Sequence, residues 1–201
     1  MNRTALRLNV LVLALTAFFL TPGVAPMVAY SKSAIPNFPD FYNPIQNGEA
    51  EVLRGVYVAG VLAMPVVQQP ADDPYYVSNH DGEVTQFSTA SQYGNIGLLA
   101  HNNLSGRSFS KLSIGQQVEL VYGDGRIEKF VITEVLRFQA LQPQSQWSSF
   151  LDLDHSQTLL ATQMFNRVYS GSHHLAFQTC IKANGNMSWG RLFVLAVPKG
   201  G

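Results

Sequence analysis

The chain has 201 residues, 46% of them hydrophobic, with 13 basic and 13 acidic residues and a formal net charge of zero. This length and composition suit one compact domain with a sizeable apolar core. The balanced charge excludes the strong positive field that gathers nucleic acid, so we expect no nucleic-acid partner.

Residues 1–29 have the pattern of an export signal. Arg3 and Arg7 supply positive charge, and residues 8–20 form an apolar stretch of about 13 residues, typical of a signal-peptide core. If residues 8–29 stay in place, their charge-free length of about 22 residues is enough to span a bilayer. The pattern is consistent with both a cleaved signal peptide and a retained membrane anchor. In either case we expect an exported protein, at the outer membrane face, in the envelope or outside the cell.

Residues 30–51 are rich in Pro, Asn and Gly and lack a helical or strand period. This composition is typical of a linker or of an arm wrapped over a domain. The folded domain is therefore expected to span residues 52–201.

The first half of that domain favours short β-strands. Residues 51–67 predict one long strand or two short ones, ended by Pro65. Residues 85–91 and 95–102 are two further strand candidates, the second ending near a histidine.

The clearest hairpin joins residues 118–122 to residues 128–138 across a Gly-Asp-Gly turn. Residues 154–170 then carry apolar side chains at helical spacing, and Asp154 or Ser156 could cap that helix. The chain closes with two strand candidates, residues 172–181 and 190–197, joined by a loop over 182–189. Many short strands with one late helix favour an all-β fold, a closed or nearly closed barrel, over a βαβ fold.

Cys180 is the only cysteine in the chain. Exported proteins normally pair their cysteines in disulfides, so a lone thiol is either an inert buried residue or a reactive group that is used. Taken alone, the inert interpretation leads, because free cysteine is among the most buried residue types. A catalytic thiol would need a nearby base or cation.

Five histidines are candidates for that base. We interpret His80 as a turn residue and His155 as a residue at a helix start. Adjacent His173 and His174 point apart in a strand and lack a third ligand, so no metal site is predicted. His101 ends an apolar segment, where a rigid strand would hold its ring at a barrel rim, either as a base or as a simple hydrogen-bonded residue.

Arg191 is expected to open the last strand, with apolar residues after it. It follows Cys180 by 191 − 180 = 11 residues, which fits a strand, a loop and a return on the adjacent strand. Its permanent charge could stabilise an oxyanion formed when a thiolate attacks a carbonyl. The alternative is an edge arginine that pairs with a surface carboxylate.

Three segments together resemble the sortase family: "GNIGLLAHN" around His101, "FSKLSIGQQVELVY" after it, and "FQTC" with "WGRLFVLA" around Cys180 and Arg191. The resemblance covers residues 52–198 and keeps the order His, Cys, Arg. Where the family writes Thr-Leu-x-Thr-Cys, residues 176–180 read Ala-Phe-Gln-Thr-Cys. The Thr-Cys pair is kept, and the first two residues of the motif are replaced.

The resemblance implies a closed eight-stranded barrel with one or two short helices, acting as a cysteine transpeptidase. Cys180 would attack a carbonyl within an LPxTG-like sorting motif near the carboxyl end of another exported protein. An envelope amine or a pilin lysine would then resolve the thioacyl enzyme. His101 would be the general acid and base, and Arg191 would hold substrate and stabilise the oxyanion. Further candidates for substrate contact are Ala100, Asn102, Thr179 and Trp189.

The resemblance implies no cofactor and no metal, and a monomer is expected. The acidic pairs Asp72–Asp73 and Asp152–Asp154 are interpreted as solvated loop charges rather than calcium ligands. Thr179 could orient substrate or make a structural hydrogen bond. The segment 142–172 would form a groove wall, in which Leu159, Met164 and Val168 either line the groove or pack in the core.

Two alternatives stand beside the transpeptidase. The replaced motif residues allow a catalytically inactive sortase-fold module that binds or assembles envelope components. A hydrolytic cysteine peptidase shares the same first half-reaction and differs in whether water or an amine arrives second.

Overall fold

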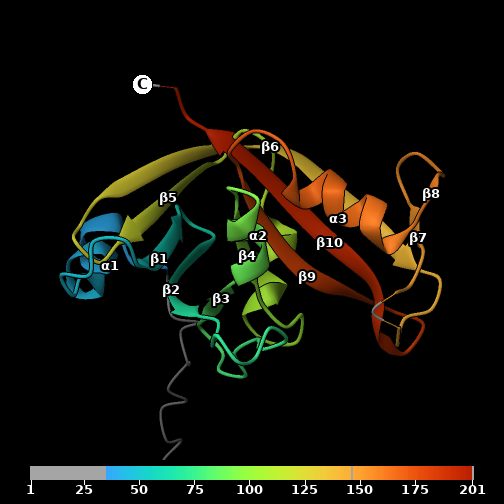
Figure 1. Ribbon diagram of the computed structural model, residues 1–201. Helices are drawn as coiled ribbons and strands as arrows, with labels where there is room; N and C mark the ends of the chain where they lie inside the picture. Colours follow the sequence, from blue (N-terminus) through green and yellow to red (C-terminus); the bar gives the residue numbers. More distant parts are fainter. Residues whose placement is uncertain (1–34, 146, 201) are drawn as a thin grey trace, which may run out of the picture. The chain divides into compact units, whose positions relative to one another are not determined.

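The computed structural model describes residues 35–145 and 147–200 (Figure 1). The predicted signal or anchor at residues 1–29 lies outside these residues, as does the start of the predicted arm. Within the described ranges, no helix is long and apolar enough to cross a membrane.

The described residues form ten strands, three short α-helices and one 3-10 helix, which is more helix than the one or two elements expected. The helices are α1 (Phe38–Ile45), α2 (Ser88–Gln92), η1 (Ser105–Lys111) and α3 (Ala161–Tyr169). The strands are β1 (Leu53–Val58), β2 (Leu62–Gln68), β3 (Val84–Gln86), β4 (Ile96–Leu99), β5 (Gln117–Tyr122), β6 (Ile127–Ala140), β7 (Phe150–Asp152), β8 (Thr158–Leu159), β9 (Leu175–Ala183) and β10 (Asn186–Pro198).

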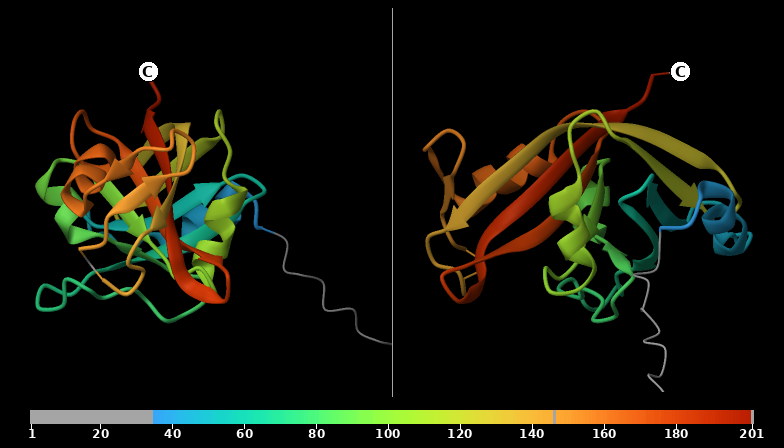
Figure 2. Two further views of the ribbon diagram at one scale, coloured as in Figure 1. Left: turned by 90° about the vertical axis from the view of Figure 1, so that its right-hand side faces the viewer. Right: turned by 180° about the vertical axis from the view of Figure 1, so that it is seen from behind.

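The sheet closes on itself. Its strand order is β10-β9-β4-β3-β2-β1-β5-β6-β7-β8, and β10 also pairs with β6. That pairing joins the first eight strands of the order into a barrel, while β7 and β8 extend the sheet beyond β6. Figure 2 shows the long strand β6 running beside β10. The prediction of a closed eight-stranded all-β barrel is confirmed.

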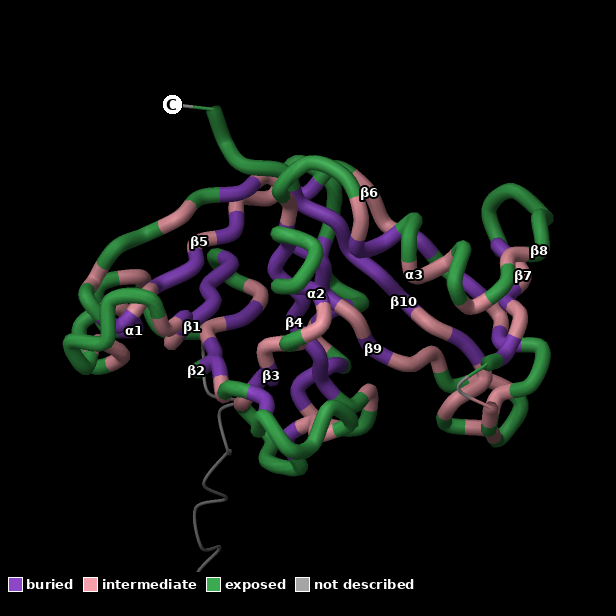
Figure 3. The backbone as a smooth tube through the Cα atoms, viewed as in Figure 1, coloured by how far each residue is buried: buried purple, intermediate pink, exposed green. Residues whose placement is uncertain are grey.

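Two apolar cores share the strands β6, β9 and β10. Side chains that alternate along a strand point to opposite faces. On β9, Leu175 and Phe177 belong to the barrel interior, whereas Ala176 belongs to an outer core. In that outer core, Val168 and Tyr169 of α3 pack against the outer face of the barrel. Figure 3 shows the buried segments of β9 and β10, which lie between the two cores.

Helix α1 lies within the predicted arm and was not expected from its pattern. Asn37 caps the helix, because its side-chain oxygen accepts from the backbone N–H of Asp40 at 3.0 Å. Phe41 packs against Tyr57 and against Gly55, where a Cβ atom would lie 2.8 Å from the Phe41 ring. The interpretation of this segment as lacking helix is therefore wrong for residues 38–45.

Two strand predictions in the first half need correction. Pro65 does not end a strand but lies inside β2, where it pairs with Gly55 of β1. The pairing of β2 with β3 begins one residue later, at Val66. The missing N–H of Pro65 therefore removes no hydrogen bond from the pairing of β2 with β3. Residues 85–91 are not one strand, because β3 ends at Gln86 and α2 follows it.

The helix near residue 160 starts later than predicted. Residues 150–159 form the hairpin β7–β8, and α3 begins at Ala161. Neither Asp154 nor Ser156 caps it; instead the side-chain oxygen of Gln163 accepts from the backbone N–H of Leu160 at 2.8 Å. The predicted hairpin at residues 118–138 is confirmed as β5 and β6.

Strand β10 is longer than predicted, and β9 begins three residues later and ends two residues later than predicted. The expected loop at 182–189 shrinks to a tight turn at Asn184 and Gly185, which both have positive φ (51° and 75°). Two such residues in sequence match the type I′ hairpin turn. Arg191 therefore lies within β10 rather than at its start.

Candidate functional site

Cys180 and Arg191 lie directly opposite each other on β9 and β10. The same antiparallel register sets Gln178 opposite Phe193. Opposed residues project from one face of a sheet, and Phe193 belongs to the outer core, so Cys180 and Arg191 share the outer face of the barrel. A two-residue turn alone would set Cys180 opposite Trp189; the register shift between Asn186 and Gly190 adds two residues to β10 and brings Arg191 opposite Cys180.

The Cys180 thiol is free and only partly buried. Its neighbour Thr179 points inward and is 5% exposed. Strand alternation therefore turns the cysteine away from the interior, so it is not part of the buried core.

His101 follows β4, which pairs in parallel with β9 so that Leu99 stands opposite Gln178. The pairing continues past the strand end, because the backbone N–H of Ala100 donates to the Gln178 carbonyl at 3.2 Å. Continued one residue beyond Ala100, this register would set the backbone of His101 level with Cys180. The His101 side chain is exposed, as expected of a residue at the rim.

The Arg191 guanidinium is held by its own strand. Its Nη1 donates to the carbonyls of Gly190 at 2.9 Å and Ser188 at 3.1 Å. Its carbon Cζ lies 6.0 Å from the centre of the Phe150 ring. These contacts show a guanidinium fixed by backbone carbonyls, rather than the surface carboxylate pair considered as an alternative.

Arg191 and Cys180 line two different cavities. Arg191, Gln178 and Phe193 line a cavity of about 560 Å³, here called the aromatic cavity, with Trp147 and Tyr169 among its walls. Cys180 is among the residues of a second cavity of about 380 Å³, together with Asn102, Thr179 and Leu192.

Comparisons with known proteins bear on the fold. No protein-family model and no curated protein matches the sequence. Among solved structures, sortase A of Listeria monocytogenes is 13% identical, with a TM-score of 0.47 over 74% of this chain and 88% of that chain. This chain is similar to sortases.

Two further sortases give similar values. The sortase D5 transpeptidase of Clostridium perfringens is 16% identical, with a TM-score of 0.45 over 78% of this chain and 82% of that chain. The lid mutant of sortase C1 of Streptococcus agalactiae is 14% identical, with a TM-score of 0.48 over 76% of this chain and 72% of that chain. The likeness concerns the fold alone.

The other residues predicted to contact substrate lie at different places in the barrel. The Thr179 hydroxyl donates to the carbonyl of buried Ala100 at 2.8 Å, the structural hydrogen bond given above as an alternative. Asn102 donates through Nδ2 to the Met187 carbonyl at 2.8 Å and so ties the segment after His101 to β10. Trp189 is half-buried in β10, two residues before Arg191.

The predicted groove wall divides between cavity and core. Met164 of α3 lines the aromatic cavity, whereas Val168 is fully buried in the outer core. Leu159 packs against that core from β8.

The adjacent histidines hold separate partners. His173 places Nδ1 2.7 Å from the Gly94 carbonyl and Nε2 2.8 Å from Glu128, whereas His174 places Nε2 2.6 Å from the Val168 carbonyl. The hydrogen bond to Gly94, opposed by burial and aided by Glu128, raises the pKa of His173. Among the described residues, no group of three or more His, Cys, Asp or Glu side chains could hold a metal ion.

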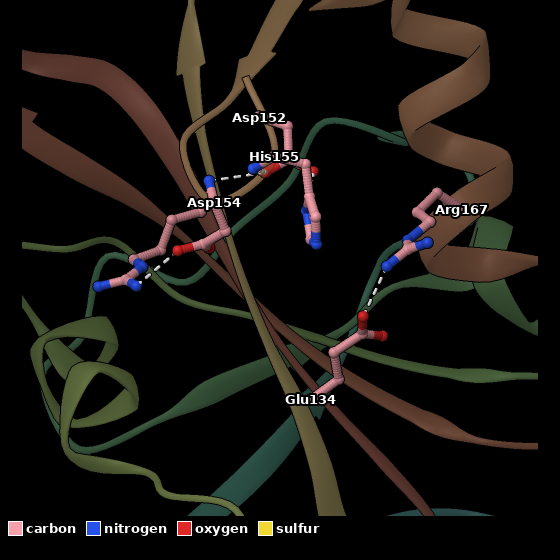
Figure 4. A network of polar contacts seen from close by, with 6 residues as sticks. Glu134, Asp152, Asp154, His155 and Arg167 are labelled. Atoms are coloured by element: carbon pink, nitrogen blue, oxygen red, sulfur yellow. Dashed lines mark hydrogen bonds and ion pairs between the residues drawn. The ribbon is translucent and has the colours of Figure 1, made fainter. Parts of the chain in front are cut away.

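The interpretation of Asp152 as a solvated loop charge is wrong. Its carboxylate is buried, and Oδ1 accepts from the backbone N–H groups of Asp154 at 2.8 Å and His155 at 3.0 Å (Figure 4). Burial favours the neutral carboxyl, but the bonds from Asp154 and His155 outweigh it and lower the pKa of Asp152. Asp152 therefore orders the β7–β8 turn, and His155 belongs to this turn rather than to a helix start.

Several residues of the aromatic cavity were not predicted. Tyr75 and Trp147, which are 77% and 72% exposed, come from loops far apart in the chain, so no spacing connects them. Gln178 did carry a signal, since it is a polar residue at an outward position of the cysteine strand.

Proposed function

We propose that this protein is a sortase-type cysteine transpeptidase with Cys180 as its nucleophile. The observation that carries the proposal is the register of β9 and β10, which sets the partly exposed thiol opposite Arg191. His101 follows the neighbouring strand β4, and the register of β4 with β9, continued beyond Ala100, supports placing it at the same end of the sheet. Three adjacent strands thus supply a nucleophile, a base and a cation.

In the first half-reaction, the Cys180 thiolate attacks a backbone carbonyl of the substrate, and the carbonyl electron pair moves onto oxygen. Arg191 stabilises this oxyanion. When the oxyanion collapses, the C–N bond breaks, His101 gives its proton to the leaving amine, and a thioester remains on Cys180.

In the second half-reaction, an amine attacks the thioester and His101 accepts the proton of that amine. A new amide bond forms as the C–S bond breaks and the thiolate returns. Water in place of the amine would give hydrolysis, so the acceptor decides between transfer and cleavage.

Arg191 suits the oxyanion role because its position is fixed before substrate arrives. The carbonyls of Ser188 and Gly190 bind one nitrogen, and a guanidinium has donors on three nitrogens. A hydrogen-bond donor that needs no reorganisation during the reaction stabilises the transition state more than a mobile donor does.

The substrate class is the one that the resemblance to sortases implies, and the location rests on the export-signal pattern. We propose that the substrates are exported proteins with an LPxTG-like motif near the carboxyl end, and that the acceptor is an envelope amine or a pilin lysine. We also propose that the protein acts outside the cytoplasm as a monomer, free or membrane-anchored.

The test is a transfer assay with the full chain, motif peptides from co-exported proteins and an amine acceptor. We expect Cys180→Ala to abolish transfer, Arg191→Ala to reduce kcat by roughly 10²–10³-fold and His101→Ala by roughly 10²–10⁴-fold. His80→Ala is the matched control, because the side chain of His80 is exposed and lies in a different loop. Full activity in the Arg191 or His101 variants would refute the assignment, and absence of any cleavage would favour the inactive binding module.

A further inference from the structure

Gln178 is a polar side chain in an apolar part of the aromatic cavity. It precedes Cys180 by two residues on the same face of β9 and stands opposite Phe193. On that face, Phe193 is 1% exposed and Ala176 is fully buried. A half-buried amide in such surroundings costs free energy unless its polar atoms form hydrogen bonds.

Tyr169 fixes the orientation of this amide. The Tyr169 hydroxyl donates to Oε1 of Gln178 at 2.6 Å. The tyrosine ring is held by Phe87, Phe165 and Phe193, at centroid distances of 5.3, 5.2 and 6.3 Å. Burial raises the pKa of Tyr169, so the hydroxyl keeps its proton and remains a donor.

With its oxygen bound to Tyr169, the Gln178 amide turns its nitrogen the other way. Within residues 35–145 and 147–200, none of the hydrogen bonds uses Nε2 of Gln178, and this atom is not among the buried unpaired nitrogens. Gln178 lines the aromatic cavity, so its amide nitrogen presents N–H donors there, two residues before Cys180 on β9.

We propose that Gln178 binds a backbone carbonyl of the substrate through its side-chain N–H, with Tyr169 as the positioning residue. This inference rests on the proposed function and names a specific contact within it. An extended peptide rises about 3.3 Å per residue, so two residues of peptide match the two residues between Gln178 and Cys180. The carbonyl bound by Gln178 is thus the one two residues from the reacting carbonyl.

The contact belongs on the acyl side of the reacting bond. The leaving peptide departs after the first half-reaction, whereas the acyl part stays until the amine attacks. A contact that holds the substrate through both steps therefore serves the acyl part, on the amino-terminal side of the cleaved bond.

The experiment measures peptide binding without chemistry, in the full chain carrying Cys180→Ala. The probe is a positional library of blocked pentapeptide amides, and the readout is the fluorescence of Trp147, which lines the cavity. We expect Gln178→Met to weaken binding of the best peptide about tenfold. Gln178→Glu should weaken it at least as much, because a carboxylate keeps the shape and the bond to Tyr169 but offers no N–H.

Two further variants separate positioning from structure. Tyr169→Phe keeps the ring and frees the amide to rotate, so we expect about a threefold loss of affinity with little change in melting temperature. Gln92→Met, an exposed glutamine of α2, is the matched control and should bind as tightly as the parent.

The carbonyl itself is tested by replacing each C=O of the best peptide with CH₂ in turn. We expect one replacement to cost the parent about tenfold and the Gln178→Met variant nothing, since both changes remove the same bond. Equal losses in both proteins at every position, or no peptide binding at all, would overturn the inference. Failure of the proposed function would give a different result. In that case peptides would bind through Gln178, but wild-type Cys180 would form no thioester.

Discussion

At the residue scale, the exposure of the Cys180 thiol depends on one step of strand alternation. Thr179 points into the barrel and donates to the Ala100 carbonyl, which fixes the direction of the next side chain. Because Arg191 stands opposite Cys180, the same register also sets the cation. A slip of β9 by one residue would bury the thiol and separate the pair.

His173 gives a pH-dependent contribution to stability. Its folded pKa is raised above the unfolded value of about 6.5, so its contacts stabilise the fold fully below that pH. The stabilisation is lost as the pH rises through the folded pKa. We therefore expect His173→Asn to lower the melting temperature more at about pH 5.5 than at about pH 9.

Thermal unfolding followed by circular dichroism checks this prediction. Glu128→Gln is the companion variant, because Glu128 is the acidic partner of the His173 ring at 2.8 Å. It should show a weakened version of the same trend, and an equal loss for His173→Asn at both pH values would contradict the account.

At the element scale, the turn from His101 into η1 has no room for an additional carbon at Gly106. A Cβ atom there would lie 2.3 Å from the Thr179 hydroxyl and 2.6 Å from the Ala100 carbonyl oxygen. Gly106→Ala should therefore cost about 2 kcal/mol of unfolding free energy, as overpacked sites do, and displace His101.

Urea unfolding measures that cost, and the transfer assay reports the displacement. Gly200→Ala is the matched control, because nothing lies within 4 Å of a Cβ at Gly200. If Gly106→Ala were as stable and as active as this control, the tight packing of η1 on β9 would not position His101.

Several elements were readable from the sequence because their signals are local. The Gly-Asp-Gly turn and flanking alternation predict β5 and β6, and the spacing from Cys180 to Arg191 predicts adjacent strands. Helix α1 was missed because it has eight residues, one of them an internal proline, and depends on the Asn37 cap and on packing against Gly55. Such tertiary contacts leave no period in the sequence.

The residues of the candidate site could be predicted from the sequence only in part, for the same reason. By residue type alone, Cys180, His101 and Arg191 each kept a structural interpretation, and it was the resemblance to sortases that singled them out as the candidate site. The bond between Tyr169 and Gln178 joins α3 to β9 across a cavity, and no spacing rule predicts it. The burial of Asp152 likewise depends on the fold of the β7–β8 turn.

At the scale of the whole molecule, the two cores share strands and should unfold together. Phe177 fills the barrel interior and Phe138 fills the outer core, and both are fully buried. Phe177→Ala and Phe138→Ala should each cost about 3–5 kcal/mol and keep one unfolding transition. Urea denaturation followed by fluorescence and circular dichroism checks this, and two separated transitions in the Phe138 variant would show that the cores are independent.

We propose that Cys180, partly exposed on the closed barrel, is an acyl-accepting nucleophile. The most direct test of this proposal is the intact mass of the folded full chain after incubation with a sorting-motif peptide and no amine acceptor. The account predicts a mass increase equal to the acyl part of the peptide, located on Cys180, released by hydroxylamine and absent in Cys180→Ala. An unmodified protein, or an adduct that persists in Cys180→Ala, would contradict it.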